Sequence, residues 1–133
     1  MVKILFVCEG NIGRSQMAEA FYNYFTNSKD ASSAGTNPKT PKRFLKIPEK
    51  ICLIMTEENI SMNNHKVKLI TKQYIKDADK IIIMCEKEYC PEFLINSNKV
   101  IYWNIKDPHH MKIENLRKIK NQIKQKIKKL INY

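Results

Sequence analysis

The chain has 133 residues, 43% of them hydrophobic, which is enough to bury a core, so we expect residues 1–133 to form a single domain. Apolar runs recur along the whole chain, which excludes a disordered protein, and none approaches the length of a membrane span. The formal net charge of +11 indicates either an anionic partner or many lysines on solvated helix faces. The first residues do not form a secretory signal, so we expect a cytoplasmic protein whose four cysteines are reduced, catalytic or metal-binding.

Short apolar runs alternate with segments of helical periodicity along the chain. The runs predict buried strands at residues 3–7, 31–34, 80–84 and 99–103. The spacing of apolar residues, with Thr71 as a cap and Pro48 in a first turn, predicts helices at residues 15–25, 48–58, 71–78 and 111–131. This alternation predicts an α/β sandwich around a parallel sheet, in which a functional site lies beyond the carboxyl ends of the strands.

The segment C-E-G-N-I-G-R-S at residues 8–15 lies between the first predicted strand and the first predicted helix. Its glycines allow tight turns and its asparagine tolerates the left-handed region, so successive N–H groups could point inward and bind an anion. Arg14 would hold two oxygens of that anion, and its charge would favour the thiolate of Cys8. The predicted oxyanion-binding loop consists of Glu9, Gly10, Asn11, Ile12, Gly13 and Ser15. The alternative is a buried structural cysteine at the end of a strand.

Asp107 and Pro108 follow the last predicted strand, in the segment W-N-I-K-D-P. A carboxyl group held over the loop could act as the general acid that protonates a leaving oxygen, and Pro108 would stiffen its position. The alternative is an Asp-Pro turn that begins the last helix. His109 and His110 come next, and we expect them to be exposed loop residues rather than acid–base groups.

Cys85 and Cys90 lie in the segment C-E-K-E-Y-C-P, directly after the third predicted strand. Two cysteines at this separation could form a disulfide if the turn between them is mobile. Zinc binding would need two further ligands, for which His109 and His110 are the candidates, and two small buried residues are the third alternative. Because this segment, the loop after Cys8 and the Asp-Pro segment all follow strands, we expect them at one end of the sheet.

With these residues in view, the chain resembles the low-molecular-weight protein tyrosine phosphatase superfamily, and within it the thioredoxin-coupled arsenate reductase branch. The motifs that carry the resemblance span nearly the whole chain: V-C-E-G-N-I-G-R-S-Q-M-A-E-A, S-A-G-T, N-H-K-V-K-L-I, I-I-I-M-C and W-N-I-K-D-P. The resemblance implies a three-layer sandwich with a four-stranded parallel sheet flanked by helices. It also implies that Cys8 is the nucleophile, Arg14 the oxyanion clamp and Asp107 the general acid.

The two branches imply different reactions at the same loop. In the phosphatase branch, Cys8 would form a phosphocysteine from phosphotyrosine or another phosphomonoester, and water would hydrolyse it. In the reductase branch, Cys8 would attack arsenate, Cys85 would attack the adduct to release arsenite, and Cys90 would convert the first disulfide into a Cys85–Cys90 disulfide. A thioredoxin- or glutaredoxin-like partner would then reduce that disulfide, with no other cofactor and no metal.

Three features favour the reductase branch: both downstream cysteines, the S-Q-M-A-E run after Arg14, and two histidines in place of the tyrosine pair that many phosphatases carry after Asp-Pro. Two features depart from it. Gly13 replaces a second loop cysteine that is frequent in both branches, and the interval between Cys85 and Cys90 is shorter than in the best-known reductases.

Lys68 stands where some reductases carry an aspartate that helps hold potassium near the residues matching Asn11 and Glu19. We expect the Lys68 ammonium group to replace that ion.

These observations favour an arsenate reductase, with a phosphatase as the alternative enzyme. A non-enzymatic protein that binds an anion or nucleic acid is the third possibility, and Cys8, Arg14 and Asp107 argue against it, as does the lack of aromatic residues among the lysines of the tail. We expect a monomer that binds a small tetrahedral oxyanion such as arsenate or phosphate, or a phosphoprotein, together with the reductant, and neither nucleic acid nor a membrane.

Overall fold

The computed structural model describes residues 2–40, 42, 46–108 and 110–133. Its strands are β1 (Ile4–Cys8), β2 (Ala31–Gly35), β3 (Lys80–Ile83) and β4 (Val100–Tyr102). Its helices are α1 (Arg14–Thr26), α2 (Glu49–Thr56), α3 (Lys72–Asp77), the 3-10 helix η1 (Lys87–Tyr89), α4 (Glu92–Ile95) and α5 (Ile113–Leu130). Each predicted strand and helix is present with slightly shifted boundaries. The sequence pattern does not predict η1 and α4, because elements this short show no periodicity.

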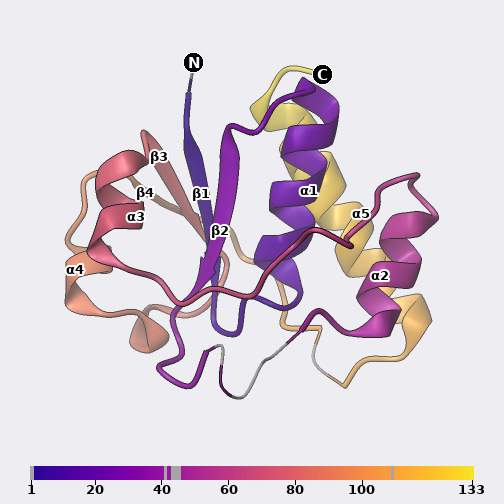
Figure 1. The fold of residues 1–133 in the computed structure, drawn as a ribbon, viewed down its shortest axis with the longest axis horizontal. Coiled ribbons are helices and arrows are strands. Elements are labelled where there is room, and N and C mark those ends of the chain that lie inside the picture. Colours follow the sequence, from indigo (N-terminus) through magenta and orange to yellow (C-terminus); the bar gives the residue numbers. More distant parts are fainter. Residues whose placement is uncertain (1, 41, 43–45, 109) are drawn as a thin grey trace.

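The strands form one parallel sheet in the order β2-β1-β3-β4 (Figure 1). Cys8 at the end of β1 pairs with Gly35 at the end of β2, and Val7 of β1 pairs with Ile83 of β3. The nucleophile candidate thus lies at the end of a central strand with a neighbour on each side. This arrangement confirms the predicted four-stranded parallel sheet.

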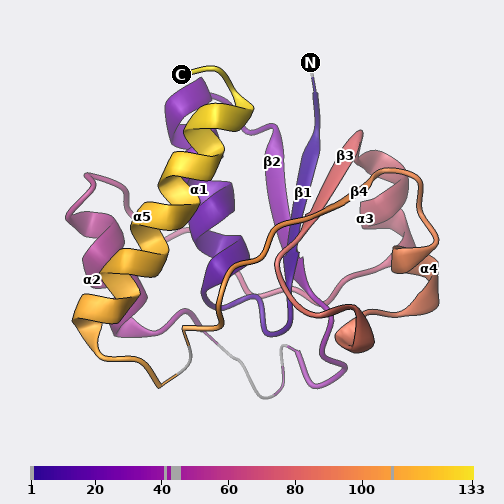
Figure 2. The same cartoon turned by 180° about the vertical axis from the view of Figure 1, so that it is seen from behind.

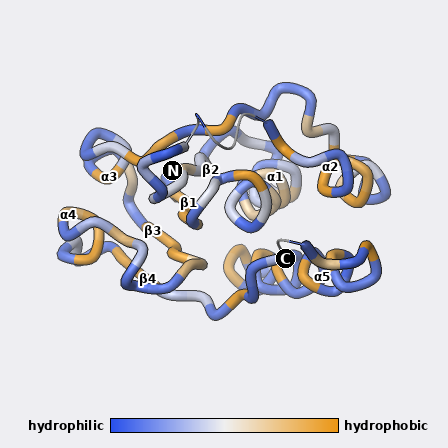
Figure 3. Tube along the Cα trace, turned by 90° about the horizontal axis from the view of Figure 1, so that it is seen from below, coloured by the Kyte–Doolittle hydropathy of each residue, from blue (hydrophilic) through white to orange (hydrophobic). Residues whose placement is uncertain are grey.

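Helices α1, α2 and α5 cover one face of the sheet, and α3 and α4 cover the other (Figures 1 and 2). Figure 3 shows the two helical layers on opposite sides of the strands. Ile4 and Phe6 of β1 pack in the hydrophobic cluster on the side of α1, whereas Leu5 and Val7 pack in the cluster on the side of α3. A strand with both faces buried needs apolar residues at every position, which explains the continuous run near the N-terminus. The predicted three-layer sandwich is therefore confirmed.

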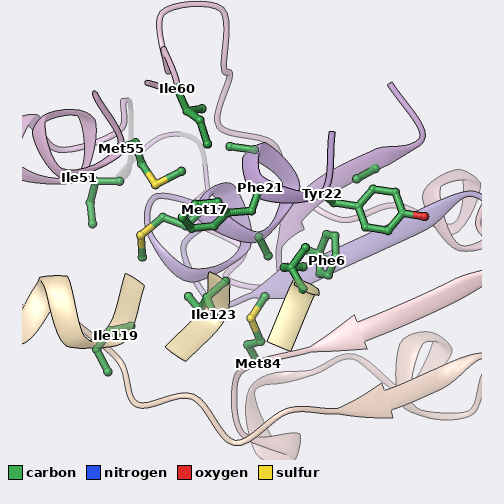
Figure 4. Close-up of a cluster of buried hydrophobic side chains, with 14 of the residues drawn as sticks. Phe6, Met17, Phe21, Tyr22, Ile51, Met55, Ile60, Met84, Ile119 and Ile123 are labelled. Carbon is green, nitrogen blue, oxygen red and sulfur yellow. The ribbon is translucent and has the colours of Figure 1, made fainter. Parts of the chain in front are cut away.

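The larger hydrophobic cluster lies between the sheet and helices α1, α2 and α5 (Figure 4). Met17 and Phe21 of α1 pack there with Ile123 of α5, and all three side chains are fully buried. The predicted apolar stripes of both helices therefore face the core. Within the described residues, neither α5 nor any other helix is long and apolar enough to cross a membrane.

The carboxyl ends of β1, β3 and β4 lie at the same end of the sheet, away from the N-terminus (Figure 1). The chain leaves β1 into the loop of residues 9–13, leaves β3 at Met84 and Cys85, and leaves β4 toward Asp107. The three segments that carry the candidate chemistry are therefore close in space, as expected for a parallel sheet.

Candidate active site

The loop between β1 and α1 runs alongside the segment that follows β2. The Thr36 N–H donates to the carbonyl oxygen of Cys8 at 3.0 Å, and the Asn37 N–H donates to the carbonyl oxygen of Glu9 at 2.9 Å. Asn11 provides the left-handed residue of the loop, with φ 57°, and no described glycine has a positive φ. The short polar side chain of asparagine makes this backbone conformation accessible, so the turn depends on Asn11 more than on the neighbouring glycines.

Cys8 is buried at the end of β1, and its Sγ atom lies 2.9 Å from Ser15 Oγ. Asn11 Nδ2 donates to the same oxygen at 2.8 Å, which leaves the hydroxyl hydrogen of Ser15 for the sulfur. The Asn11 amide is itself fixed, because its Oδ1 accepts hydrogen bonds from Gln16 Nε2 at 3.0 Å and from the Lys68 backbone N–H at 2.9 Å. Ser15 therefore contacts the Cys8 sulfur, and Asn11 orients this contact.

A cluster of charged and polar groups lies behind the loop, around Glu19 of α1. His65 Nδ1 lies 3.2 Å from Glu19 Oε2 and 2.8 Å from Gln16 Oε1. Ser33 donates to Glu19 Oε1 at 2.8 Å, and Lys68 Nζ lies 4.0 Å from that oxygen. Burial lowers the pKa values of His65 and Lys68, and the charge of Glu19 opposes both shifts. Gln16, His65 and Ser33 are not among the site residues predicted from the sequence, although all three belong to the motifs that carry the resemblance.

Arg14 is the first residue of α1, and its buried guanidinium group reaches the ends of β3 and β4. Its Nη1 donates to the carbonyl oxygen of Met84 at 2.5 Å and to that of Ile105 at 3.1 Å. Both bonds use one nitrogen, so they hold the guanidinium group in place without requiring Nε or Nη2. A guanidinium group fixed in this way can offer two parallel N–H donors to an oxyanion.

Cys8, Arg14 and Asp107 line one pocket of about 300 Å³ above the loop. Its wall is largely apolar and comes from Ile12, Pro48, Ile51, Pro108, Met111 and Leu116. Lys50 and His110 also line it, and the sequence analysis did not place Lys50 there. His109 lies outside the described residues. The pocket brings together the predicted nucleophile, clamp and acid, and it has room for a group larger than a bare oxyanion.

Cys85 and Cys90 lie on either side of η1, with their Sγ atoms 3.8 Å apart. Cys85 is buried and Cys90 is half-buried. The hydrogen bond from Cys85 to Cys90 is the main cause of both pKa shifts: it raises the pKa of Cys85, which burial raises further, and it lowers the pKa of Cys90. Cys90 is therefore the sulfur of this pair that ionises first. Cys52 lies apart from them on α2.

Cys85 lines a second, open groove of about 1090 Å³. Glu9, Arg14 and Asp107 line both this groove and the smaller pocket, so the two cavities adjoin. Within the described residues, which do not include His109, no three His, Cys, Asp or Glu side chains gather to hold a metal ion.

Residues 3–133 match the profile of the family described as low molecular weight phosphotyrosine protein phosphatase. The chain belongs to this family. Arsenate reductase 2 of Staphylococcus saprophyticus is 29% identical to it, over 94% of this chain and 92% of the relative. An arsenate reductase of Bacillus cereus is 27% identical, over 95% of this chain and 91% of the relative.

Solved structures of the low molecular weight phosphatase fold match nearly the whole chain. An arsenate reductase in the phosphate binding state has a TM-score of 0.82 at 25% identity, and the match covers 99% of this chain and 98% of that one. The Erwinia amylovora tyrosine phosphatase has a TM-score of 0.83 at 23% identity, over 99% of this chain and 93% of that one, a likeness of fold alone. Proteins named for either reaction thus share this fold, so the reaction has to be argued from the site.

Proposed function

We propose that this member of the low molecular weight phosphatase family is a thiol-dependent arsenate reductase. The observation that carries the proposal is the 3.8 Å separation of the Cys85 and Cys90 sulfurs, with Cys85 lining a groove that shares Arg14 with the oxyanion pocket. Hydrolysis through a phosphocysteine requires neither sulfur. The names of the S. saprophyticus and B. cereus relatives support the same function.

In the first step, the Cys8 thiolate attacks the arsenic atom of arsenate and forms a sulfur–arsenic bond. The loop N–H groups and Arg14 hold the other oxygens, and Ser15 stabilises the thiolate through the 2.9 Å contact with its sulfur. One arsenate oxygen leaves as water, with a proton supplied by Asp107, which lines the same pocket as Cys8 and Arg14.

In the second step, the Cys85 thiolate attacks Cys8 Sγ. A sulfur–sulfur bond forms, the sulfur–arsenic bond breaks, and its electron pair passes to arsenic, which leaves as arsenite. The Cys90 thiolate then attacks Cys85 Sγ, which releases the Cys8 thiolate and leaves a Cys85–Cys90 disulfide. Cys90 is only half-buried, which suits reduction of that disulfide by an external dithiol protein of the thioredoxin or glutaredoxin type.

The test is mass spectrometry of the reduced protein after anaerobic incubation with arsenate, with free thiols alkylated before digestion. Trypsin places the four cysteines in four different peptides, residues 4–14, 51–66, 81–87 and 88–99, because Lys87 separates Cys85 from Cys90. The expected product is a disulfide between peptides 81–87 and 88–99. Phosphate, which has the same shape and charge but is not reduced, is the matched control anion.

The disulfide must also require Cys8, so the Cys8→Ser variant should leave all remaining thiols free after arsenate treatment. A disulfide that forms equally with phosphate, or without Cys8, would reflect adventitious oxidation and would refute the relay.

The apolar wall of the smaller pocket supports a second candidate, a phosphatase acting on phosphotyrosine or another phosphomonoester. Ile51, Met111 and Leu116 offer an apolar surface for an organic group attached to the phosphate. Arsenate carries no such group and would leave this surface without a contact. Under this alternative, the protein would hydrolyse an aryl phosphate through Cys8 while the thiols of Cys85 and Cys90 stay free during turnover. The same mass-spectrometric experiment separates the two candidates.

A further inference from the structure

The surroundings of Cys85 favour the protonated thiol over the thiolate. Attack on another sulfur, however, requires the thiolate. The hydrogen bond to Cys90 and burial both raise the pKa of Cys85. Two groups oppose this shift, the hydroxyl of Thr36 and the positive charge of Arg14. Tyr102 of β4 lines the same groove as Cys85, and its pKa is raised by burial and by the negative charge that ionised Cys90 and Cys85 would carry.

Thr36 is held rigidly beside the oxyanion loop, directly after β2. Its N–H donates to the Cys8 carbonyl oxygen at 3.0 Å, and the preceding residue, Gly35, is hydrogen-bonded through its own N–H to the Lys68 carbonyl oxygen at 2.7 Å. The residue is only 6% exposed. In the part of the chain that the structure describes, its buried hydroxyl has no hydrogen-bond partner. Buried hydroxyl groups are rarely left without a partner, so this one requires an explanation.

We propose that the Thr36 hydroxyl is the hydrogen-bond donor that stabilises the Cys85 thiolate during its attack on the Cys8 adduct. The role in that attack rests on the proposed function, whereas the hydrogen bond to the thiolate does not. Thr36 acts through Cys85 and is therefore a positioning residue. In the resting state Cys90 donates its proton to the Glu86 carbonyl oxygen at 3.6 Å and Cys85 donates to Cys90, while the Thr36 hydroxyl has no partner in the part of the chain that is described. When Cys85 loses that proton, its sulfur becomes an acceptor and the hydroxyl acquires a partner.

The test compares Thr36→Val, which keeps the shape and removes the hydroxyl, with Thr36→Ser, which keeps the hydroxyl. The readout is the pH dependence of iodoacetamide alkylation at each cysteine, followed by mass spectrometry of peptides 81–87 and 88–99. For Thr36→Val we expect alkylation of Cys85 to slow by about tenfold at a given pH, because a hydrogen bond to a charged group is lost. Thr36→Ser should remain close to the wild type, and alkylation of Cys8 should not change in either variant.

The same variants are then given arsenate, and the Cys85–Cys90 disulfide is followed in a single turnover. The disulfide should form about tenfold more slowly in Thr36→Val than in Thr36→Ser. Equal alkylation of Cys85 in the two variants would overturn the proposal, as would an equal loss in both, which would indicate a purely structural role. If Thr36→Val does not fold, Thr36→Ala replaces it. If the wild-type protein forms no disulfide with arsenate, the proposed reductase function is refuted. The alkylation profile would then still show whether the Thr36 hydroxyl stabilises the Cys85 thiolate.

Discussion

A Cβ atom on Gly35 would lie 2.8 Å from the carbonyl oxygen of Glu9, a distance that real side chains essentially never show. It would also lie 3.2 Å from the Cβ atom of Asn11, the left-handed residue of the loop. The end of β2 therefore contacts the backbone of the oxyanion loop directly. Glycine is needed in the S-A-G-T motif for this close approach and not for an unusual φ.

We predict that Gly35→Ala displaces the loop and lowers the affinity for phosphate or arsenate by about tenfold or more, with a loss of about 1–3 kcal/mol in the free energy of unfolding. Gly13→Ala is the matched control, because a Cβ atom there meets only Pro108 Cγ, at an ordinary contact distance of 3.4 Å. Anion titration and urea unfolding of both variants check the prediction. Similar effects of the two substitutions would contradict it.

The sheet could be predicted from the sequence because β1 is buried on both faces and so consists of one apolar run. The site could be placed because functional residues of a parallel sheet lie beyond the carboxyl ends of its strands. It could not place His65 against Gln16, since that contact joins residues 49 positions apart and depends on how the chain returns across the loop. The approach of Cys85 to Cys90 depends on η1, a turn too short to leave a periodic pattern. The burial of Lys120 was missed because its partner, Glu58, lies in another part of the sequence.

We predict that Cys90 reacts with iodoacetamide at lower pH than Cys85. The hydrogen bond from Cys85 lowers the pKa of Cys90, whereas that bond and burial raise the pKa of Cys85. As pH rises, the thiolate of Cys90 therefore appears first, and between about pH 6 and 9 alkylation should favour peptide 88–99 over peptide 81–87. Preferential alkylation of Cys85 across this range would contradict the direction of the hydrogen bond.

We predict that Glu58→Gln destabilises the protein by about 1–3 kcal/mol at neutral pH, between the values for exposed and buried ion pairs. Glu58 Oε2 lies 2.7 Å from Nζ of the buried Lys120, and Glu58 Oε1 lies 2.6 Å from Lys124 Nζ. The substitution leaves the Lys120 charge buried with a weaker partner. The control is Glu57→Gln, which removes the exposed pair with Arg117 and should cost less than about 1 kcal/mol.

The difference in stability between the wild type and Glu58→Gln should depend on pH. Burial opposes the charged form of Glu58, but hydrogen bonds from Lys120 and Lys124 outweigh it and hold the pKa below the usual 4.5. The stabilisation is therefore fully present above that value and is lost as the pH falls through the lower folded-state pKa. Urea unfolding at neutral and acidic pH should show wild type and Glu58→Gln converging in acid. A difference that grows in acid would exclude this ion pair as its source.

Lys68 places a cation behind the oxyanion loop. Lys68 Nζ lies 4.0 Å from Glu19 Oε1 and donates to the Lys66 carbonyl oxygen at 2.7 Å, so an ammonium group occupies the space beside the carboxylate. Burial lowers the pKa of Lys68 and Glu19 opposes that shift. We therefore expect reductase or phosphatase activity, and the midpoint of thermal unfolding, to be the same in potassium chloride and in tetramethylammonium chloride of equal ionic strength.

Lys68→Asp should reverse this behaviour. It removes the ammonium group and places a second carboxylate near Glu19, so the variant should be destabilised without a metal cation and regain stability as potassium is added. Lys68→Gln, which adds no charge, is the control and should show no such recovery. Strong activation of the wild type by potassium would mean that Lys68 does not replace the ion, and the side chain would then have to move aside to admit it.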